Sequence, residues 1–270
     1  MKIGSREFDT ENKCYIMGIL NVTPDSFSDG GRWDTFDSAM YHAEDMVRCG
    51  ADIIDVGGES TRPGYTAIGE REETDRTSPV VEALHRRFDI PISIDTCKSA
   101  VAKAALDAGA DIVNDIRGLS GDIGMPEVIA RTGAACCLVH NRKIPDYHDF
   151  MKDLIDDLRL SAETALNAGI NADRIILDPG IGFVKTYGMN LEAINRLDLV
   201  VELGYPVLLG VSRKSVIGTA LELPVTERLE GSLAAAVIGV LRGASFIRAH
   251  DVKETRRAVA MAEAIIGSYT

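Results

Sequence analysis

Eight short apolar runs rich in strand-forming residues recur along the chain, and stretches with helical periodicity separate them. We expect strands at residues 15–22, 51–57, 91–96, 111–116, 135–140, 175–179, 206–211 and 245–250. We expect helices at residues 36–49, 71–87, 99–108, 149–168, 190–203, 225–242 and 252–266, and a shorter one at 124–132. Regular alternation of strands and helices predicts a parallel sheet, and eight such units predict an α/β fold, the (β/α)8 TIM barrel.

Three of the expected helices end on one small motif, in which Gly is followed by Ala and then by Asp or Ser. Gly50, Gly109 and Gly243 hold this place, which suits the left-handed residue after a helix. A chain of 270 residues fits one barrel domain. We interpret residues 15–270 as that single domain and residues 1–14 as a short N-terminal extension that closes the barrel bottom.

Composition argues against several classes of partner. A net charge of −12 and a pI near 4.9 argue against a nucleic-acid or anionic membrane surface. No apolar run approaches the roughly 18 residues of a membrane span, and the first residues lack a secretory apolar segment. The five cysteines form no C-x-x-C pair, and we read Cys136 and Cys137 as buried core residues rather than zinc ligands. We therefore expect a cytoplasmic protein.

Each expected strand ends in hydrogen-bonding or charged residues. In a TIM barrel these ends meet at one face, where active sites are built. Any one ending could be only a strand stop or the cap of the next helix. All eight together predict a ring of polar side chains around one opening. The endings are residues 21, 57–62, 95–96, 114–115, 140–142, 178, 212–215 and 248–250.

The first loop, residues 21–31, has the composition of an active-site loop. It follows a buried run and concentrates hydrogen-bonding groups around one aromatic residue, Phe27. A plain connector does not need such a density of functional groups. The hydrogen-bonding residues are Asn21, Asp25, Ser26, Ser28 and Asp29.

Five segments resemble the dihydropteroate synthase family. They read ILNVTPDSFSDGG (19–31), DVGGESTRPG (55–64), DPGIGF (178–183), GVSRKS (210–215) and RAHDV (248–252), in order and each at an expected strand end. The resemblance implies a transferase of folate biosynthesis that is a sulfonamide target and is assisted by Mg²⁺. It would join 6-hydroxymethyl-7,8-dihydropterin diphosphate to p-aminobenzoate, giving 7,8-dihydropteroate and diphosphate.

The resemblance implies a pterin site built from Asp95, Asn114, Asp178, Lys214 and Arg248. The three acidic or amide side chains would read the donor and acceptor edge of the heterocycle. Lys214 would donate to its carbonyl group, and the guanidinium of Arg248 would stack on its face. Val139 stands where the family often has Met, so we expect less contact with the pterin there.

The diphosphate site implied by the resemblance combines Thr61, Arg62, Arg248 and His250 with the N-terminus of the last helix, which favours anions. Asn21 would offer its side-chain oxygen to Mg²⁺, a metal that takes few protein ligands beside phosphate and water. The p-aminobenzoate site would use residues of four loops, namely Phe27, Ser28, Arg62, Pro63, Phe183, Lys214 and Ser215.

We expect a dissociative reaction, in which the C–O bond to diphosphate breaks before the amine attacks. The resemblance assigns catalytic roles to Asp29, Asp95 and Lys214, with the two carboxylates stabilising a cationic intermediate. Closure of the first two loops would exclude water.

Three other functions on the same barrel fold stay open at this stage. A non-catalytic pterin-binding paralogue would not need the intact segment 21–29, and a pterin-dependent methyltransferase would not need Arg62, Arg248 and His250 together. A sugar-phosphate barrel enzyme would not require the sequences of the first two loops. Family members are homodimers, typically through their last helices, so we expect a homodimer.

Overall fold

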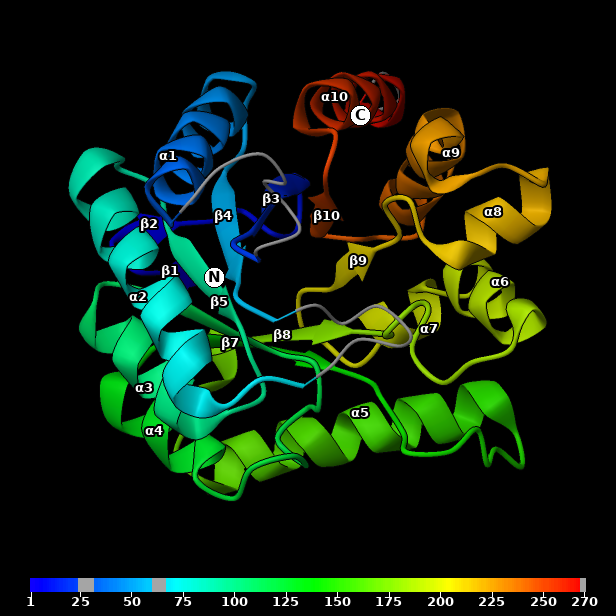
Figure 1. Cartoon of the computed structure of the whole chain (residues 1–270). Helices are drawn as coiled ribbons and strands as arrows, with labels where there is room; N and C mark the ends of the chain where they lie inside the picture. Colours follow the sequence, from blue (N-terminus) through cyan, green and yellow to red (C-terminus); the bar gives the residue numbers. More distant parts are fainter. Residues whose placement is uncertain (24–31, 60–66, 268–270) are drawn as a thin grey trace.

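The structure is a computed structural model that describes residues 1–23, 32–59 and 67–267; there, eight parallel strands alternate with helices (Figure 1). Neighbouring strands follow the order β8-β7-β6-β5-β4-β3-β10-β9. A parallel bridge between Leu177 and Val207 joins the two edges, so the sheet closes on itself and the predicted TIM barrel is confirmed. The strands are β3 (Tyr15–Asn21), β4 (Ile53–Gly57), β5 (Ile92–Asp95), β6 (Ile112–Asp115), β7 (Ala135–Val139), β8 (Ile175–Asp178), β9 (Leu208–Gly210) and β10 (Phe246–Ala249).

Helices surround the sheet on its outer side (Figure 1). Gly50, Gly109 and Gly243 have φ angles of +97°, +107° and +91°, as expected for residues that end helices. The helices are α1 (Arg32–Arg48), α2 (Glu70–Arg87), α3 (Ser99–Asp107), α4 (Met125–Thr132), α5 (Phe150–Asn167), α6 (Tyr187–Asn195), α7 (Asp198–Val201), α8 (Ser215–Leu221), α9 (Leu229–Leu241) and α10 (Val252–Gly267), with 3-10 turns at Ala172–Arg174 and Val225–Glu227.

Two expected helices were wrong in extent. The helix expected at 190–203 is divided into α6 and α7, because Arg196 leaves the helical region with φ −112° and ψ 32°. The helix expected at 225–242 is a 3-10 turn followed by α9, since Arg228 has φ −105° and ψ 16°. Helix α8 was not expected at all; Glu222, with φ +57°, ends it after two turns, too short a length to show a period in the sequence.

The strands alternate between two apolar layers because successive side chains point to opposite faces. Ile54, Val56, Ile92 and Ile94 belong to the cluster between sheet and helices. A second, smaller cluster fills the barrel interior. Its members are Ile3, Phe8, Met17, Ile53, Ile112, Ala135, Cys137, Val139, Ile176, Leu208 and Phe246. Cys136 and Cys137 are both fully buried, as the sequence predicted.

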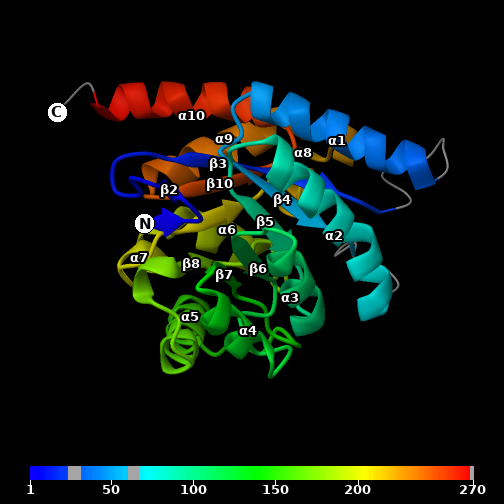
Figure 2. The same cartoon turned by 90° about the vertical axis from the view of Figure 1, so that its left-hand side faces the viewer.

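The first residues form a small hairpin of β1 (Lys2–Ile3) and β2 (Arg6–Glu7), which Figure 2 shows at one end of the barrel. Phe8 packs edge-on against Tyr15, with ring centroids 4.7 Å apart, and lies 5.9 Å from the ring of Phe246. Since Tyr15 and Phe246 begin their strands, the hairpin lies at the end where the strands start. Within residues 1–23, 32–59 and 67–267, no helix combines the length and the apolar character needed to cross a membrane.

Candidate active site

Polar side chains occupy the interior positions next to the apolar interior layer, toward the carboxyl ends of the strands. Asp55 follows Ile53 by two residues, and Asn114, Asp178 and Arg248 follow Ile112, Ile176 and Phe246 in the same way. Side chains two residues apart on a strand share a face. The period of the strands therefore directs this polar set into the end of the barrel where the sequence placed the site.

Arg248 is the centre of this set. Its Nε donates to Asp55 Oδ2 at 2.6 Å, and its Nη2 donates to Asp95 Oδ2 at 2.7 Å. Asn114 Nδ2 donates to the same Asp55 oxygen at 3.1 Å. Among the described residues, the other oxygens of these two partners, Asp55 Oδ1 and Asn114 Oδ1, are buried acceptors without a hydrogen-bond donor. Buried acceptors left unpaired cost free energy, so they favour a ligand that carries N–H groups.

Asp178, Lys214 and Arg248 meet around Gly210. A Cβ atom on Gly210 would lie 3.7 Å from both Asp178 Oδ2 and Lys214 Nζ, and 3.9 Å from Arg248 Cβ. A side chain there would occupy the space between the carboxylate and the ammonium. These are ordinary van der Waals distances, so the glycine keeps this space open without being sterically required.

Burial sets the protonation behaviour of these groups. It raises the pKa of Asp95 to about 7, although Arg248 opposes the effect. It also raises the pKa of Asp178, against the opposing charge of Lys214. Burial lowers the pKa of Lys214 to about 8, with Asp178 opposing. For Arg248, Asp55 and Asp95 outweigh burial and raise the pKa, so the guanidinium stays charged.

Four further residues of the sequence analysis lie at the carboxyl ends of strands or in the connections that follow them. Asn21 ends β3, and a Cβ on Gly57 would lie 3.4 Å from its Oδ1 and 4.0 Å from Asp95 Oδ2. His250 follows β10, with Nδ1 3.0 Å from Ser212 Oγ. The ring centroid of Phe183 lies 4.9 Å from Lys214 Nζ. Ser215 is exposed at the first residue of α8.

Some strand endings do not join the ring that was expected. His140 Nε2 lies 3.0 Å from Asp157 Oδ2 of α5, and Arg142 Nε donates to the same oxygen at 2.6 Å. In the ending 114–115, Asn114 joins the set, whereas Asp115 accepts from the backbone N–H groups of Arg117 and Leu119, at 2.9 Å and 2.7 Å. The expectation that all eight endings face one opening was therefore wrong. The outward position of His140 directs its side chain away from the opening, and backbone N–H groups of the next turn bind the carboxylate of Asp115.

Several site residues of the sequence analysis lie outside the described residues. They are Phe27, Ser28 and Asp29 of the first loop, and Thr61, Arg62 and Pro63 of the second. Val139 is described, and it is buried in the barrel interior as a member of the apolar cluster there.

Sequence reasoning missed two residues of this region. Asp55 was quoted in a motif but given no role, although a fully buried carboxylate requires a partner. An acidic residue inside an apolar strand was the signal that could have found it. Lys185 was also missed; it follows the segment 178–183, and its three hydrogen-bond acceptors are backbone carbonyls that no sequence pattern reveals.

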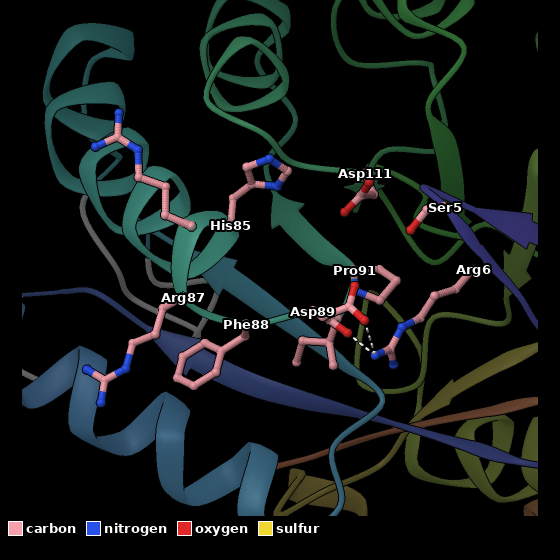
Figure 3. A pocket seen from close by; sticks show the side chains of 10 residues that line it. Ser5, Arg6, His85, Arg87, Phe88, Asp89, Pro91 and Asp111 are labelled. Atoms are coloured by element: carbon pink, nitrogen blue, oxygen red, sulfur yellow. Dashed lines mark hydrogen bonds and ion pairs between the residues drawn. The ribbon is translucent and has the colours of Figure 1, made fainter.

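A separate hollow of about 320 Å³ lies at the other end of the barrel, where β5 and β6 begin (Figure 3). Its lining comes from the hairpin, the end of α2 and the residues just before those two strands. Arg6 faces Asp89 across it, with Nη2 3.4 Å from Oδ2. Arg6, Arg86 and Arg87 of the lining each pair with a carboxylate and do not call for a ligand, so this hollow is not the candidate site.

Comparison with known proteins identifies the family. The family model for pterin binding enzymes matches residues 17–250. The dihydropteroate synthase of Clostridium beijerinckii is 53% identical over 98% of this chain and 99% of its own, and that of Bacillus subtilis is 48% identical over 95% and 90%.

The chain belongs to the dihydropteroate synthase family of pterin-binding enzymes.

Solved dihydropteroate synthases have the same fold. The enzyme of Clostridium difficile, whose crystal structure was determined in the presence of pteroic acid, superimposes with a TM-score of 0.94 at 48% identity, covering 96% of this chain and 99% of that one. The enzyme of Yersinia pestis, in a complex with a sulfonamide drug, gives 0.93 at 43% identity and covers 99% of both chains. Dihydropteroate synthases are transferases, and the family resemblance seen in the sequence is thereby confirmed.

Proposed function

We propose that this chain condenses 6-hydroxymethyl-7,8-dihydropterin diphosphate with p-aminobenzoate, forming 7,8-dihydropteroate and diphosphate. The observation that carries the proposal is a polar set at the carboxyl end of the barrel, in which Asp55, Asn114 and Asp178 are buried and Lys214 and Arg248 are half-buried. Relatives of the same length and fold that are named dihydropteroate synthases support it.

The proposed pterin site uses the buried acceptors and donors of that set. Asp178 and the unpaired oxygens of Asp55 and Asn114 would accept the N–H groups of the heterocycle, whereas Lys214 would donate to its carbonyl oxygen. Arg248 carries five N–H donors, and its two bonds to Asp55 and Asp95 leave others for the ligand. Those two bonds also fix the plane of the guanidinium, as stacking on a flat ring requires.

The diphosphate would lie beside Arg248 and His250, with Thr61 and Arg62 of the second loop as further ligands. Asn21 Oδ1 lies close to Gly57 and Asp95 and could be a ligand of Mg²⁺. This cation takes few protein oxygens and keeps phosphate and water as its other ligands. The described residues contain no group of three His, Cys, Asp or Glu side chains that could hold a metal by themselves. When bound there, Mg²⁺ would neutralise charge on the leaving diphosphate.

The p-aminobenzoate would lie on the other side of Lys214. Phe183, 4.9 Å from the ammonium, presents an aromatic surface there, and Ser215 is exposed next to Lys214 in the chain. The remaining contacts would come from Phe27, Ser28, Arg62 and Pro63 of the first two loops.

The proposed reaction uses these groups together with Asp29 of the first loop, which lies outside the described residues. The C–O bond breaks and its electron pair leaves with the diphosphate, whose charge Arg248 and His250 balance. The electron-rich dihydropterin delocalises the resulting cation, which the carboxylates of Asp95 and Asp29 stabilise. The lone pair of the aryl amine then forms the C–N bond, and the amine proton passes to solvent.

Diphosphate release measured with both substrates tests the proposal. We expect release that requires pterin diphosphate and p-aminobenzoate together and yields dihydropteroate. Release without the amine would show a hydrolase. Pterin binding without release would show a non-catalytic pterin-binding protein, and transfer of a methyl group would show a methyltransferase.

A homodimer and a cytoplasmic location complete the proposal. Neighbouring helices α9 and α10 expose large apolar side chains, namely Ile238, Leu241, Met261 and Ile266, with 43%, 58%, 61% and 45% of their surfaces accessible. Exposed apolar residues gathered on adjacent helices favour burial against a second copy. All five cysteines are free, which suits a reducing compartment. Light scattering coupled to size exclusion would give the mass of a monomer if the dimer is wrong.

A further inference from the structure

Lys185 is a half-buried lysine in the connection between β8 and α6. Its Nζ donates to three backbone carbonyl oxygens, those of Gly180 at 2.8 Å, Phe183 at 3.2 Å and His140 at 3.2 Å. An ammonium has three N–H donors, so these bonds use all of them. Two acceptors lie in the connection itself and the third follows β7, which means that one side chain ties the connection to the neighbouring strand.

The connection has a backbone that must be held in place. Gly180, Gly182 and Val184 have φ angles of +68°, +85° and +42°. A left-handed conformation is costly for a β-branched residue such as Val184 and persists only where the surroundings impose it. Asn190 of α6 supplies a second restraint, because its Oδ1 accepts from Gly182 N at 2.6 Å.

The same connection carries groups of both proposed substrate sites. Gly180 N donates to Asp178 Oδ1 at 2.6 Å, and Lys214 Nζ donates to the carbonyl oxygen of Ile181. The Phe183 ring lies beside the Lys214 ammonium. Lys185 bonds directly to the backbone carbonyl of Phe183, so it restrains the residue that carries this ring.

We propose that Lys185 is a positioning residue, which sets the place of the Phe183 ring for p-aminobenzoate by holding the backbone on either side of it. The inference rests on the proposed function, since it takes Phe183 as a wall of the p-aminobenzoate site. Lys185 acts on the p-aminobenzoate site through Phe183, and its bond to Gly180 also holds the backbone whose N–H donates to Asp178. Burial lowers the pKa of Lys185 to about 7; the ammonium donates to all three carbonyls, whereas the neutral amine has only two N–H donors.

Steady-state kinetics of Lys185→Met test the inference, because methionine fills similar space without a donor. We expect the KM for p-aminobenzoate to rise at least tenfold, with kcat within threefold of the parent. Lys185→Arg, which keeps N–H donors, is expected to recover most of the loss. Lys152→Met is the matched control: Lys152 is 70% exposed on α5, and we expect no change in either constant.

A double-mutant cycle separates positioning from a general structural role. If Lys185 acts through Phe183, adding Lys185→Met to Phe183→Ala raises the KM for p-aminobenzoate less than twofold further. Effects that multiply in the double variant, or an unchanged KM in Lys185→Met, would overturn the inference.

Two controls keep the experiment decisive. If thermal unfolding shows that Lys185→Met does not fold, Lys185→Leu, which also lacks a donor, enters the same cycle under the same criteria. A parent protein without synthase activity would overturn the proposed function and the inference together. An active parent whose p-aminobenzoate KM ignores Lys185 would overturn the inference alone.

Discussion

Replacing Arg248 with methionine removes the only cation that hydrogen-bonds both Asp55 and Asp95 among the described residues. The side chains of Arg248, Asp55 and Asp95 are 18%, 0% and 12% exposed, so water cannot replace the lost partner well. Loss of one member of a buried ion pair typically costs about 3–5 kcal/mol, and loss of two charged hydrogen bonds gives a similar figure of about 3–6 kcal/mol. We therefore expect the free energy of unfolding at pH 7.5 to fall by about 3–5 kcal/mol, or about 10 °C in Tm for a chain of this size.

The loss should shrink as the pH falls. Asp95 has a pKa of about 7 in the folded protein and an ordinary value of 3.8. Between these values the folded state binds more protons than the unfolded state, so stability rises as the pH decreases. Without Arg248, which lowers this pKa, the folded pKa of Asp95 rises further and the effect becomes larger. Protonation at pH 5.5 then removes one of the two uncompensated charges.

Urea unfolding followed by circular dichroism at pH 7.5 and pH 5.5 measures both effects. Arg48→Met is the control, because Arg48 is 74% exposed in its pair with Asp45, and we expect no measurable loss. Adding Asp55→Asn to Arg248→Met is expected to recover part of the stability. A loss below about 1 kcal/mol at pH 7.5 would refute the reasoning, since it lies under the range for a broken buried pair. So would a loss that grows at pH 5.5.

Three further predictions concern the site. Asp178→Asn should weaken pterin binding about 100-fold, at about 1.4 kcal/mol per tenfold, because the amide replaces one of the two acceptor oxygens with an NH2 donor and removes the negative charge. Calorimetry measures this, and Asp173→Asn should bind like the parent. The pH profile of kcat/KM for pterin diphosphate should be bell-shaped, because Asp95 loses its charge as the pH falls through about 7 and Lys214 loses its charge as the pH rises above about 8. A flat profile from pH 6 to 9 would contradict these roles. Gly180→Ala should reduce stability and activity together, because residue 180 has a φ of +68° and the new Cβ would lie 1.9 Å from a carbonyl oxygen. Unfolding curves that match those of the parent would disprove the requirement for glycine at this position.

The barrel could be predicted because its signals are local. A period of two in the strands and the glycines after helices act within a few residues, and the polar strand ends follow from the same alternation. The short helix α8 and the break at Arg196 escaped prediction, since two turns give no readable period and the break depends on backbone angles at one residue.

The sequence predicted which residues form the site better than it predicted the hydrogen bonds between them. Asp95, Asn114, Asp178, Lys214 and Arg248 could be named from motifs, and the structure places them around one end of the barrel. The sequence could not show that Arg248 bonds to Asp55 as well as Asp95, because these residues are 193 and 153 positions apart from it. It also placed His140 at the opening, whereas the outward face of β7 directs that ring to Asp157.

The order of strands, the direction of their side chains and the family are properties of the sequence alone, because each depends on residue type at short and regular spacing. The pairing of charges is a property of the tertiary structure. The curved sheet brings β4, β5 and β10 together around a buried interior, where a carboxylate needs a cation as its partner. The packing of the connection after β8 places three carbonyl oxygens within hydrogen-bond distance of Lys185. Burial then shifts the pKa of Asp95 and of Lys214 toward neutral pH, which no spacing of residues along a chain can convey.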